Sequence, residues 1–299
     1  MGLYVEIPIA SDIDEVWEKT QNPKLHQRWD LRFNEIEYLP RADDEPQKFL
    51  YRTRIGFGLR IDGAGESTGT RDGDDGSRTS SLRFWSADPK SLIKTGSGYW
   101  KYVPESNGLR FFTWYDYETR FGPVGKILDK FAFRPLLGWA TAWSFDRLRL
   151  WIEQGVPPEV SRNRAIIYSI ARVTVAFTWF YHGLFPKLLH RDAIELDLLR
   201  RIGTPASRLI AAVTVAGWVE IFVALLMLVL WRQRWPLWLT VFLMLAGIPI
   251  VAISAPAYLG AAFNPVTLNL GLAALAAIGL ISGSDLPTAT RCSRKPNQQ

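Results

Sequence analysis

The sequence predicts a soluble α+β domain followed by an all-α bundle of four transmembrane helices. Charged and glycine-rich stretches fill the chain up to about residue 164, whereas residues 208–284 contain long runs with hardly an ionisable group. Several stretches before residue 122 alternate apolar and polar side chains, which is typical of strands with one buried face. With 299 residues, the chain is also long enough for two domains.

The first elements are expected to be a strand and a short helix. Residues 3–9 carry apolar side chains at every second position, and Ser11 with Asp14 makes a capping-box start for the helix. Alternation over 49–57 and 109–121 predicts two longer strands of a curved antiparallel sheet. Further strands are expected near 33–39, 59–70, 77–87 and 97–104.

A long helix is expected to close the soluble domain. Within 136–152, apolar residues recur at spacings of three and four on more than one side of the helix. Pro135 is expected in the first turn or at a kink, because proline fits there without losing a hydrogen bond. We assign residues 1–158 to the soluble domain and 159–164 to a linker.

Three segments of this domain carry a resemblance: VEIPIASDIDEVWE, the following NPKLHQRWD, and the closing TAWSFDRLRLWIEQG. Together with the order of the elements, they resemble the START-like, polyketide-cyclase-like superfamily (SRPBCC). The resemblance implies a helix-grip fold, in which the sheet wraps the last helix around an apolar cavity. It also implies binding of lipids, polyketides or other hydrophobic small molecules, usually without a metal.

The soluble domain shows no catalytic or metal-binding pattern. His26 stands beside Trp29 in a short helix, and we interpret it as a packing or surface residue. The glycines of 63–69 lie among strand residues with no helix opening after them, unlike a nucleotide-binding loop. The aspartates of 72–75 lack the spacing of a calcium loop. We therefore expect no catalytic residue, no metal site and no evident cofactor, apart from a quinone or lipid as ligand.

The charge and cysteine content exclude other classes. The formal charge is +6, but the basic residues flank the apolar runs, as in membrane proteins, so we expect no nucleic-acid partner. The single cysteine, Cys292, lies in a polar tail (288–299), so neither an intramolecular disulfide nor a C-x-x-C redox pair can form. The N-terminus lacks the pattern of a signal peptide, which predicts that the first domain stays in the cytoplasm.

Four segments approach the length and apolarity of a membrane span: 165–189, 209–231, 235–259 and 266–283. Pro249 and Pro256 predict a kink in the third, and Gly279 with Gly283 makes a small-residue face on the fourth. We assign the bundle to residues 165–287. Residues 190–206 mix apolar and charged side chains and predict an interfacial amphipathic helix.

The segments ARVTVAFTWFYHGLFPKLL, AGWVEIFVALLMLV and FNPVTLNLGLAALAAIGL resemble the DoxX-like family of four-helix membrane proteins. The resemblance implies a prokaryotic membrane protein, with some relatives acting as partners of membrane redox enzymes. The lack of cysteine pairs argues against a thiol-redox role. Four spans after a cytoplasmic domain predict a multi-pass protein of the inner membrane with both termini cytoplasmic, and the basic flanks give a modest bias in the same direction.

Ionisable residues inside spans cost about 2.5 to 3.5 kcal/mol on insertion scales and are functional candidates. Arg172, His182 and Glu220, together with Tyr181, are the predicted ligand-binding residues. Glu220 is expected to pair with Arg172 or to hydrogen-bond toward Tyr181 and His182. The group is interpreted either as a buried pair that fixes helix register or as a pocket for a quinone or other head group. Lys187 is expected to snorkel to the outer interface.

These observations predict a membrane-anchored binding protein for a hydrophobic small molecule or lipid, with the helix-grip domain at the cytoplasmic face. One alternative is a non-thiol subunit of a membrane quinone-linked oxidoreductase, with an oxidoreductase partner and a quinone between Arg172, His182 and Glu220. The other is a structural membrane anchor or assembly factor. The lack of convergent acids, bases and nucleophiles favours binding over turnover.

Overall fold

The computed structural model describes residues 2–42, 44–56, 58–262 and 264–296. The chain divides into two compact units. The sheet unit comprises Met1–Arg162 together with Pro287–Gln299, and the helical unit comprises Asn163–Leu286.

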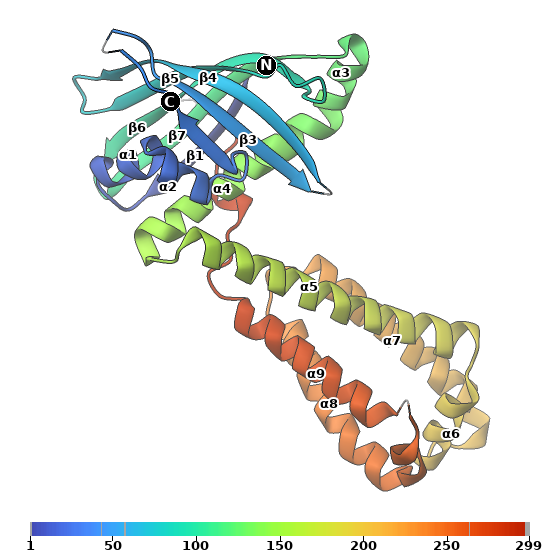
Figure 1. Ribbon diagram of the computed structural model, residues 1–299. Helices are drawn as coiled ribbons and strands as arrows, with labels where there is room; N and C mark the ends of the chain where they lie inside the picture. Colours follow the sequence, from blue (N-terminus) through green and yellow to red (C-terminus); the bar gives the residue numbers. More distant parts are fainter. Residues whose placement is uncertain (1, 43, 57, 263, 297–299) are drawn as a thin grey trace. The chain divides into compact units, whose positions relative to one another are not determined.

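A curved antiparallel sheet forms most of the sheet unit (Figure 1). Across the described residues it has seven strands in the order β1-β7-β6-β5-β4-β3-β2, and all neighbours are antiparallel. The strands predicted from the alternating pattern are present with shifted ends. They are β1 (Leu3–Ile9), β2 (Glu35–Tyr38), β3 (Lys48–Gly56), β4 (Leu59–Asp72), β5 (Arg78–Trp85), β6 (Ile93–Glu105) and β7 (Gly108–Thr119).

Two short helices, α1 (Ile13–Gln21) and α2 (Pro23–Trp29), connect β1 to β2. The N-cap of α1 is Asp12, whose carboxylate accepts a 2.7 Å hydrogen bond from the Glu15 backbone N–H. The predicted capping box was therefore misplaced by one residue, because Asp12 and not Ser11 is the N-cap. Asn22 ends α1 and caps α2, so the chain turns between the two helices with little loop.

The last helix of the sheet unit, α4 (Arg134–Gln154), packs on the inner face of the sheet. Phe145 is fully buried, and its ring centroid lies 4.6 Å from that of Phe111 in β7. The predicted fold, a sheet wrapped on a long C-terminal helix, is confirmed. The resemblance implies an apolar cavity beside α4, but among the described residues large buried rings fill that space: Trp29, Trp100, Tyr102, Phe111, Tyr115 and Tyr117.

The segment between β7 and α4 was not predicted. It forms α3 (Gly122–Leu128) and the π-helix η1 (Asp129–Phe133). Phe121 and Gly122 both have left-handed backbones, with φ of 65° and 53°, which turn the chain sharply from strand to helix. A Cβ at Gly125 would lie 1.7 Å from the Arg120 carbonyl oxygen, so only glycine fits this turn.

The segment that the sequence presents as a polar tail packs on the sheet unit. Ser293 forms an antiparallel bridge with Glu6 of β1, with two N–H···O distances of 2.9 Å. The buried Cys292 Sγ lies 3.2 Å from the Ala142 carbonyl oxygen in α4. The tail therefore pairs with the outer edge of β1 and closes part of the core.

The helical unit contains α5 (Pro158–His182) from residue 163 onward, η2 (Gly183–Leu189), α6 (Ala193–Arg201), η3 (Ala206–Arg208), α7 (Leu209–Val229), α8 (Trp235–Ser254), η4 (Pro256–Gly260) and α9 (Pro265–Ser282). Among the described residues, three helices are long and apolar enough to cross a membrane: Ala206–Val229, Trp235–Ser254 and Pro265–Ser282. The predicted count of four is therefore not exact. Polar side chains, Arg172 among them, dilute the apolar residues of α5.

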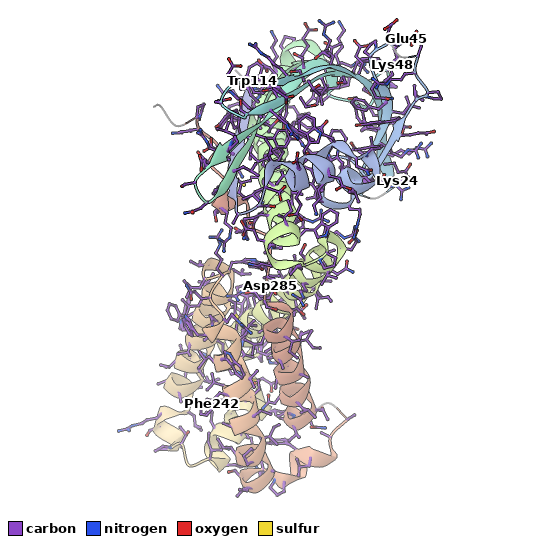
Figure 2. The ribbon with its side chains drawn as sticks, turned by 90° about the vertical axis from the view of Figure 1, so that its left-hand side faces the viewer. Lys24, Glu45, Lys48, Trp114, Phe242 and Asp285 are labelled. Carbon is purple, nitrogen blue, oxygen red and sulfur yellow. The ribbon has the colours of Figure 1, made fainter. Side chains whose placement is uncertain are left out.

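The core of the helical unit combines all four long helices. Trp179 of α5 donates a 3.0 Å hydrogen bond to the Thr240 hydroxyl of α8, and the buried Met227 of α7 lies in the same cluster. The outer faces are apolar, as Phe242 illustrates, since it is 68% exposed and projects from α8 (Figure 2). Exposed apolar side chains around long apolar helices are typical of a lipid-facing surface.

Candidate functional site

The predicted site residue Arg172 caps the end of a helix. Its fully buried guanidinium donates to the carbonyl oxygens of Met227 and Leu230, both at 2.6 Å, and to that of Gln233 at 2.9 Å. It also donates to the Tyr168 hydroxyl. Carbonyls at a helix C-terminus lack partners within the helix, so this side chain satisfies the end of α7. The predicted pairing of Arg172 with Glu220 was wrong.

Glu220 pairs instead with Lys187. Their Oε1 and Nζ atoms are 3.2 Å apart, and the same Nζ lies 3.0 Å from Glu195 Oε1. Lys187 is buried, so the predicted snorkelling was wrong, and the two carboxylates explain why its charge remains inside. Glu220 Oε2 is buried without a hydrogen-bond partner among the described residues.

The other two predicted residues lie near this cluster. A Cβ at Gly183, directly after His182, would meet the Glu220 Cβ at 3.0 Å, so η2 and α7 approach closely here. Tyr181 is half-exposed and its ring stacks on Phe185 with 4.9 Å between centroids. The structure thus places His182 beside the Glu220 segment and Tyr181 at the outer face. Arg172 does not belong to this group, because it bonds to other partners.

A second group lies on the inner face of the sheet, in the half that α4 does not cover. We call it the aromatic strip: His26, Phe33, Tyr51, Phe49 and Tyr38. Consecutive ring centroids along it are 5.3, 5.3, 6.5 and 6.1 Å apart. Its side chains are partly exposed, in contrast to the buried rings beside α4.

Glycines in the neighbouring strand make room for the strip. A Cβ at Gly63 would lie 2.2 Å from Tyr51 Cζ, and one at Gly65 would lie 2.4 Å from Phe49 Cζ. The two rings therefore lie across β4, where any side chain would displace them. Burial raises the pKa of Tyr51 to about 12, so its phenol stays neutral at pH 7. The glycines of β4 thus serve aromatic packing.

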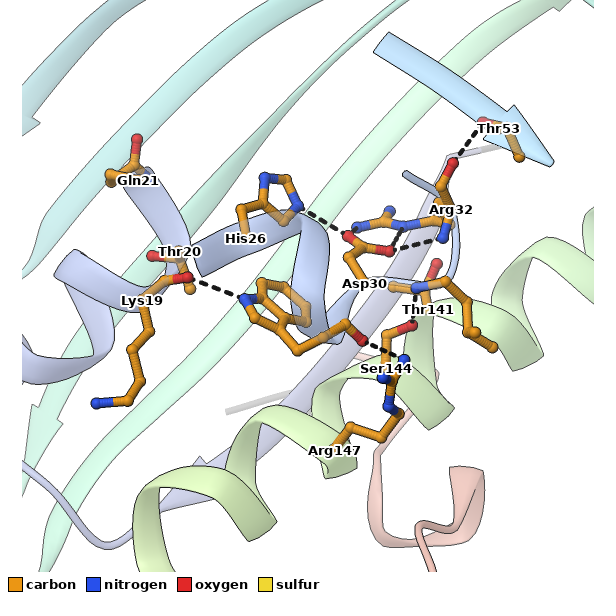
Figure 3. A network of polar contacts seen from close by, with 12 residues as sticks. Lys19, Thr20, Gln21, His26, Asp30, Arg32, Thr53, Thr141, Ser144 and Arg147 are labelled. Atoms are coloured by element: carbon orange, nitrogen blue, oxygen red, sulfur yellow. Dashed lines mark hydrogen bonds and ion pairs between the residues drawn. The ribbon is translucent and has the colours of Figure 1, made fainter. Parts of the chain in front are cut away.

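One end of the strip meets a buried charge cluster (Figure 3). Asp30 is 2% exposed; its Oδ2 accepts from His26 Nε2 at 3.0 Å and from Arg32 Nη2 at 2.6 Å. Burial alone would raise the pKa of Asp30, but the charge of Arg32 and the two hydrogen bonds hold it well below the usual range. Asp30 and Arg32 are therefore both ionised at neutral pH.

His26 is neutral at pH 7. Burial lowers its pKa, and the hydrogen bond with Asp30 opposes this only in part. The neutral ring donates from Nε2 to the carboxylate, so Nδ1 carries a free lone pair and accepts hydrogen bonds. Among the described residues Nδ1 has no partner. Its ring is held between Trp29, stacked at 5.0 Å, and the edge of Trp100 at 4.9 Å.

Backbone contacts fix the segment that carries the cluster. Arg147 of α4 donates to the carbonyl oxygens of Arg28 and Trp29 at 2.8 and 2.9 Å. The Leu31 N–H donates to the Ser144 hydroxyl at 2.9 Å. Sequence reasoning set His26 aside and did not single out Asp30 or Arg32. The signal in the sequence was the spacing of four residues between His26 and Asp30, which places the two side chains on one face of a helix next to the apolar Trp29.

The described residues contain no group of three or more His, Cys, Asp or Glu side chains that could hold a metal ion. The strip and its cluster can instead hold an apolar ring system against aromatic faces and accept a hydrogen bond at one end. Among the described residues, the side chain that is hydrogen-bonded to the histidine is the Asp30 carboxylate, which also pairs with Arg32.

Comparisons with known proteins cover both units. The model of the DoxX-like family matches residues 176–277. The uncharacterized membrane protein YndG of Bacillus subtilis (strain 168) is 41% identical over 295 residues, which cover 98% of this chain and 97% of that protein.

Solved structures resemble about half of the chain. A STAR-related lipid transfer protein from Xanthomonas axonopodis matches with 17% identity and a TM-score of 0.40, covering 51% of this chain and 85% of that one. The Zhui aromatase/cyclase from Streptomyces sp. R1128 matches with 12% identity and a TM-score of 0.35, covering 50% of this chain and 96% of that one.

Proposed function

We propose that this chain, which belongs to the family of the Bacillus subtilis membrane protein YndG and joins a helix-grip domain to a DoxX-like membrane domain, binds a hydrophobic small molecule or lipid on its aromatic strip. The observation that carries the proposal is the continuous row of partly exposed rings that ends at His26. Binding sites for small molecules are mostly apolar and aromatic, with a few polar groups that fix orientation.

The polar end of the strip favours a ligand with a hydrogen-bond donor. His26 Nδ1 is an acceptor without a partner among the described residues, and the Asp30–Arg32 pair satisfies itself. A hydroxyl or phenol group therefore suits this end better than a carboxylate, which would meet a lone pair. His26→Phe keeps the ring contacts and removes the acceptor, so we expect about tenfold weaker binding from the lost hydrogen bond.

Native mass spectrometry of the full-length protein, released from membranes, tests this function. We expect a bound molecule on the wild type and its loss from Phe49→Ala. Leu50→Ala is the matched control, because it removes a similar apolar side chain from the opposite face of the same strand. A wild type without any bound molecule would contradict the proposal and leave the role of structural anchor or assembly factor. Equal loss from both variants would remove the strip as the binding surface.

The connectivity supports a multi-pass topology with both ends of the helical unit on one side. The chain leaves the sheet unit after Arg162 and re-enters it at Pro287, which supports an even number of membrane crossings. The three apolar helices supply three crossings, and we propose that α5 supplies the fourth, with the charge of Arg172 satisfied by carbonyl oxygens. The basic flanks favour the cytoplasmic side of an inner membrane for the sheet unit: Arg162, Arg164, Arg232, Arg234 and Arg291.

Labelling of intact cells with an impermeant maleimide tests this topology. Ala206→Cys, between α6 and α7, should react from outside, whereas Asp74→Cys in the sheet unit should react only after lysis. The opposite pattern would reverse the orientation. Reaction of both positions from the same side would show that α5 does not cross.

A second candidate is a quinone-linked subunit of a membrane oxidoreductase. The observation that favours it is the buried Oε2 of Glu220, which has no hydrogen-bond partner among the described residues and lies near Lys187 and the His182 segment. Arg172 takes no part in this version, because its donors are engaged elsewhere. It predicts that Glu220→Gln abolishes electron transfer to quinone in membranes while the protein still folds. Unchanged transfer would remove this candidate.

A further inference from the structure

The segment between β7 and α4 exposes an unusual density of large apolar side chains. We call them the α3 patch: Val124, Ile127, Leu128, Phe131 and Leu136, each more than half exposed. Phe131 is 74% exposed and Val124 is 72% exposed. Contiguous apolar side chains rimmed by polar ones mark interaction surfaces, because water around them is unfavourable.

The exposure does not result from a segment detached from the sheet. The Tyr117 hydroxyl of β7 donates to Asp129 Oδ1 at 2.6 Å, and Arg134 Nε donates to Asp129 Oδ2 at 2.9 Å. Phe133 packs edge-on against the Tyr117 ring with 6.1 Å between centroids. One side of α3 and η1 is therefore fixed to the domain, and the α3 patch is the side that remains outward.

Within residues 121–133, the exposed charges have one sign. Lys126 and Lys130 are exposed there. The acid in residues 121–133 is Asp129, which is buried and bonded to Tyr117 and Arg134. Apolar side chains flanked by lysines, with no exposed acid among them, are the composition of helices that lie in the surface of an anionic bilayer.

We propose that α3 and η1 dock on the surface of an anionic lipid bilayer, with Val124, Ile127 and Phe131 among the acyl chains and the two lysines at the head groups. The proposal goes beyond ligand binding by the aromatic strip and does not depend on it. A second copy of the chain fits less well. Symmetric pairing of two such patches would bring four lysines together without an exposed acid to match them.

Spin labels on the full-length protein in liposomes test the docking. Labels are placed at Val124→Cys, at Phe131→Cys and, as a control, at Ser106→Cys in the exposed turn between β6 and β7. The native Cys292 can remain, because it is buried and burial raises the pKa of its thiol to about 12, which suppresses labelling. Treating the parent protein, which has only Cys292, with the spin label checks this directly, because no label signal is expected.

In phosphatidylcholine mixed with phosphatidylglycerol, we expect labels at positions 124 and 131 to relax with oxygen and to lose accessibility to a water-soluble nickel chelate. The Ser106 label should stay accessible to nickel. Phosphatidylcholine alone, high salt, or Lys126→Glu with Lys130→Glu should restore nickel accessibility at 124 and 131. Nickel accessibility at these positions in every lipid would overturn the proposal. Dipolar broadening between labels would instead identify a second copy as the occupant and would overturn it too.

Discussion

The sheet unit and the helical unit each bury an arginine that satisfies the end of a helix, but the surroundings differ. Arg147 donates to carbonyl oxygens at the end of α2, and Arg172 does the same at the end of α7. Arg147 is itself buried, but Arg28 beside it is partly exposed, so water has a short path to these carbonyl oxygens once the guanidinium is removed. The end of α7 belongs to an apolar span. The comparison indicates that a hydrogen bond from arginine to a carbonyl oxygen contributes more to stability in an apolar span than near water.

The buried carboxylates differ in the same way. In the sheet unit, Asp30 has donors on both oxygens, from Arg32 and His26. In the helical unit, Glu220 has Lys187 at one oxygen, and the other has no partner among the described residues. A satisfied cluster stabilises and rigidifies its surroundings, whereas an incomplete one is a candidate for proton or ligand binding.

The largest expected effect comes from Arg172→Met. Three carbonyl oxygens of the helical unit would lose their donor, at about 1 to 2 kcal/mol each, so we expect a loss of roughly 3 to 6 kcal/mol. Arg147→Met should cost roughly half as much, because water can replace part of its contacts. Thiol reactivity during heating measures both: native Cys292 reports on the sheet unit, and Ala276→Cys in a Cys292→Ser background reports on the helical unit. Equal losses of stability in the two variants would show that the apolar surroundings of Arg172 do not strengthen its hydrogen bonds.

Asp30→Asn should come next. It leaves the buried Arg32 without its counter-charge, and breaking a buried ion pair costs about 3 kcal/mol or more. We expect a lower melting temperature of the sheet unit, read from the reactivity of Cys292. Asp62→Asn is a control, because that carboxylate pairs with Arg52 in a partly exposed site. An equal drop in melting temperature in both variants would mean that the buried Asp30–Arg32 pair contributes no more than the partly exposed Asp62–Arg52 pair.

Acidification should weaken the sheet unit through His26. Its folded pKa lies below the ordinary value of about 6.5, so the unfolded chain takes up the proton first. Stability is then fully present above that pH and falls as the pH drops below it. The melting temperature of the wild type and of His26→Gln is measured between about pH 7.5 and about pH 5, the range in which histidines titrate. We expect the melting temperature of the variant to depend less on pH. Parallel curves would exclude this histidine as the cause.

The smallest effect is expected from Glu220→Gln. Lys187 keeps Glu195 as its counter-charge, and the variant removes a carboxylate that is only half satisfied. We expect a change of stability within about 1 kcal/mol, in contrast to Asp30→Asn. The Ala276→Cys reporter measures it. A loss as large as that of Asp30→Asn would show that Glu220 is a structural partner of Lys187.

Periodic features were predictable from the sequence, and contacts between distant residues were not. The alternation in 49–57 and 109–121 located β3 and β7, and the apolar runs located α7 and α8, because burial on one face or on all faces leaves a regular pattern. Arg172 was recognised as unusual but given the wrong partner. Its acceptors are backbone carbonyl oxygens, which every residue possesses and which therefore leave no mark in the sequence.

The candidate site was missed for a related reason. The aromatic strip gathers residues from α2, the following turn, β2 and β3, and its room comes from glycines of β4. Neither the strand order nor the register was known from the sequence, so these rings could not be placed together. Lys187 shows the same limit, because its partners Glu195 and Glu220 come from two other helices.

The return of the chain to β1 has a consequence for biosynthesis. Ser293 pairs with Glu6, and Cys292 fills part of the core, yet both residues are translated after every membrane helix. Domains generally fold in the order in which they emerge from the ribosome, but the edge of β1 stays open until the residues after α9 have been translated. The outer edge of β1 therefore gains this pairing only after the apolar helices have been translated.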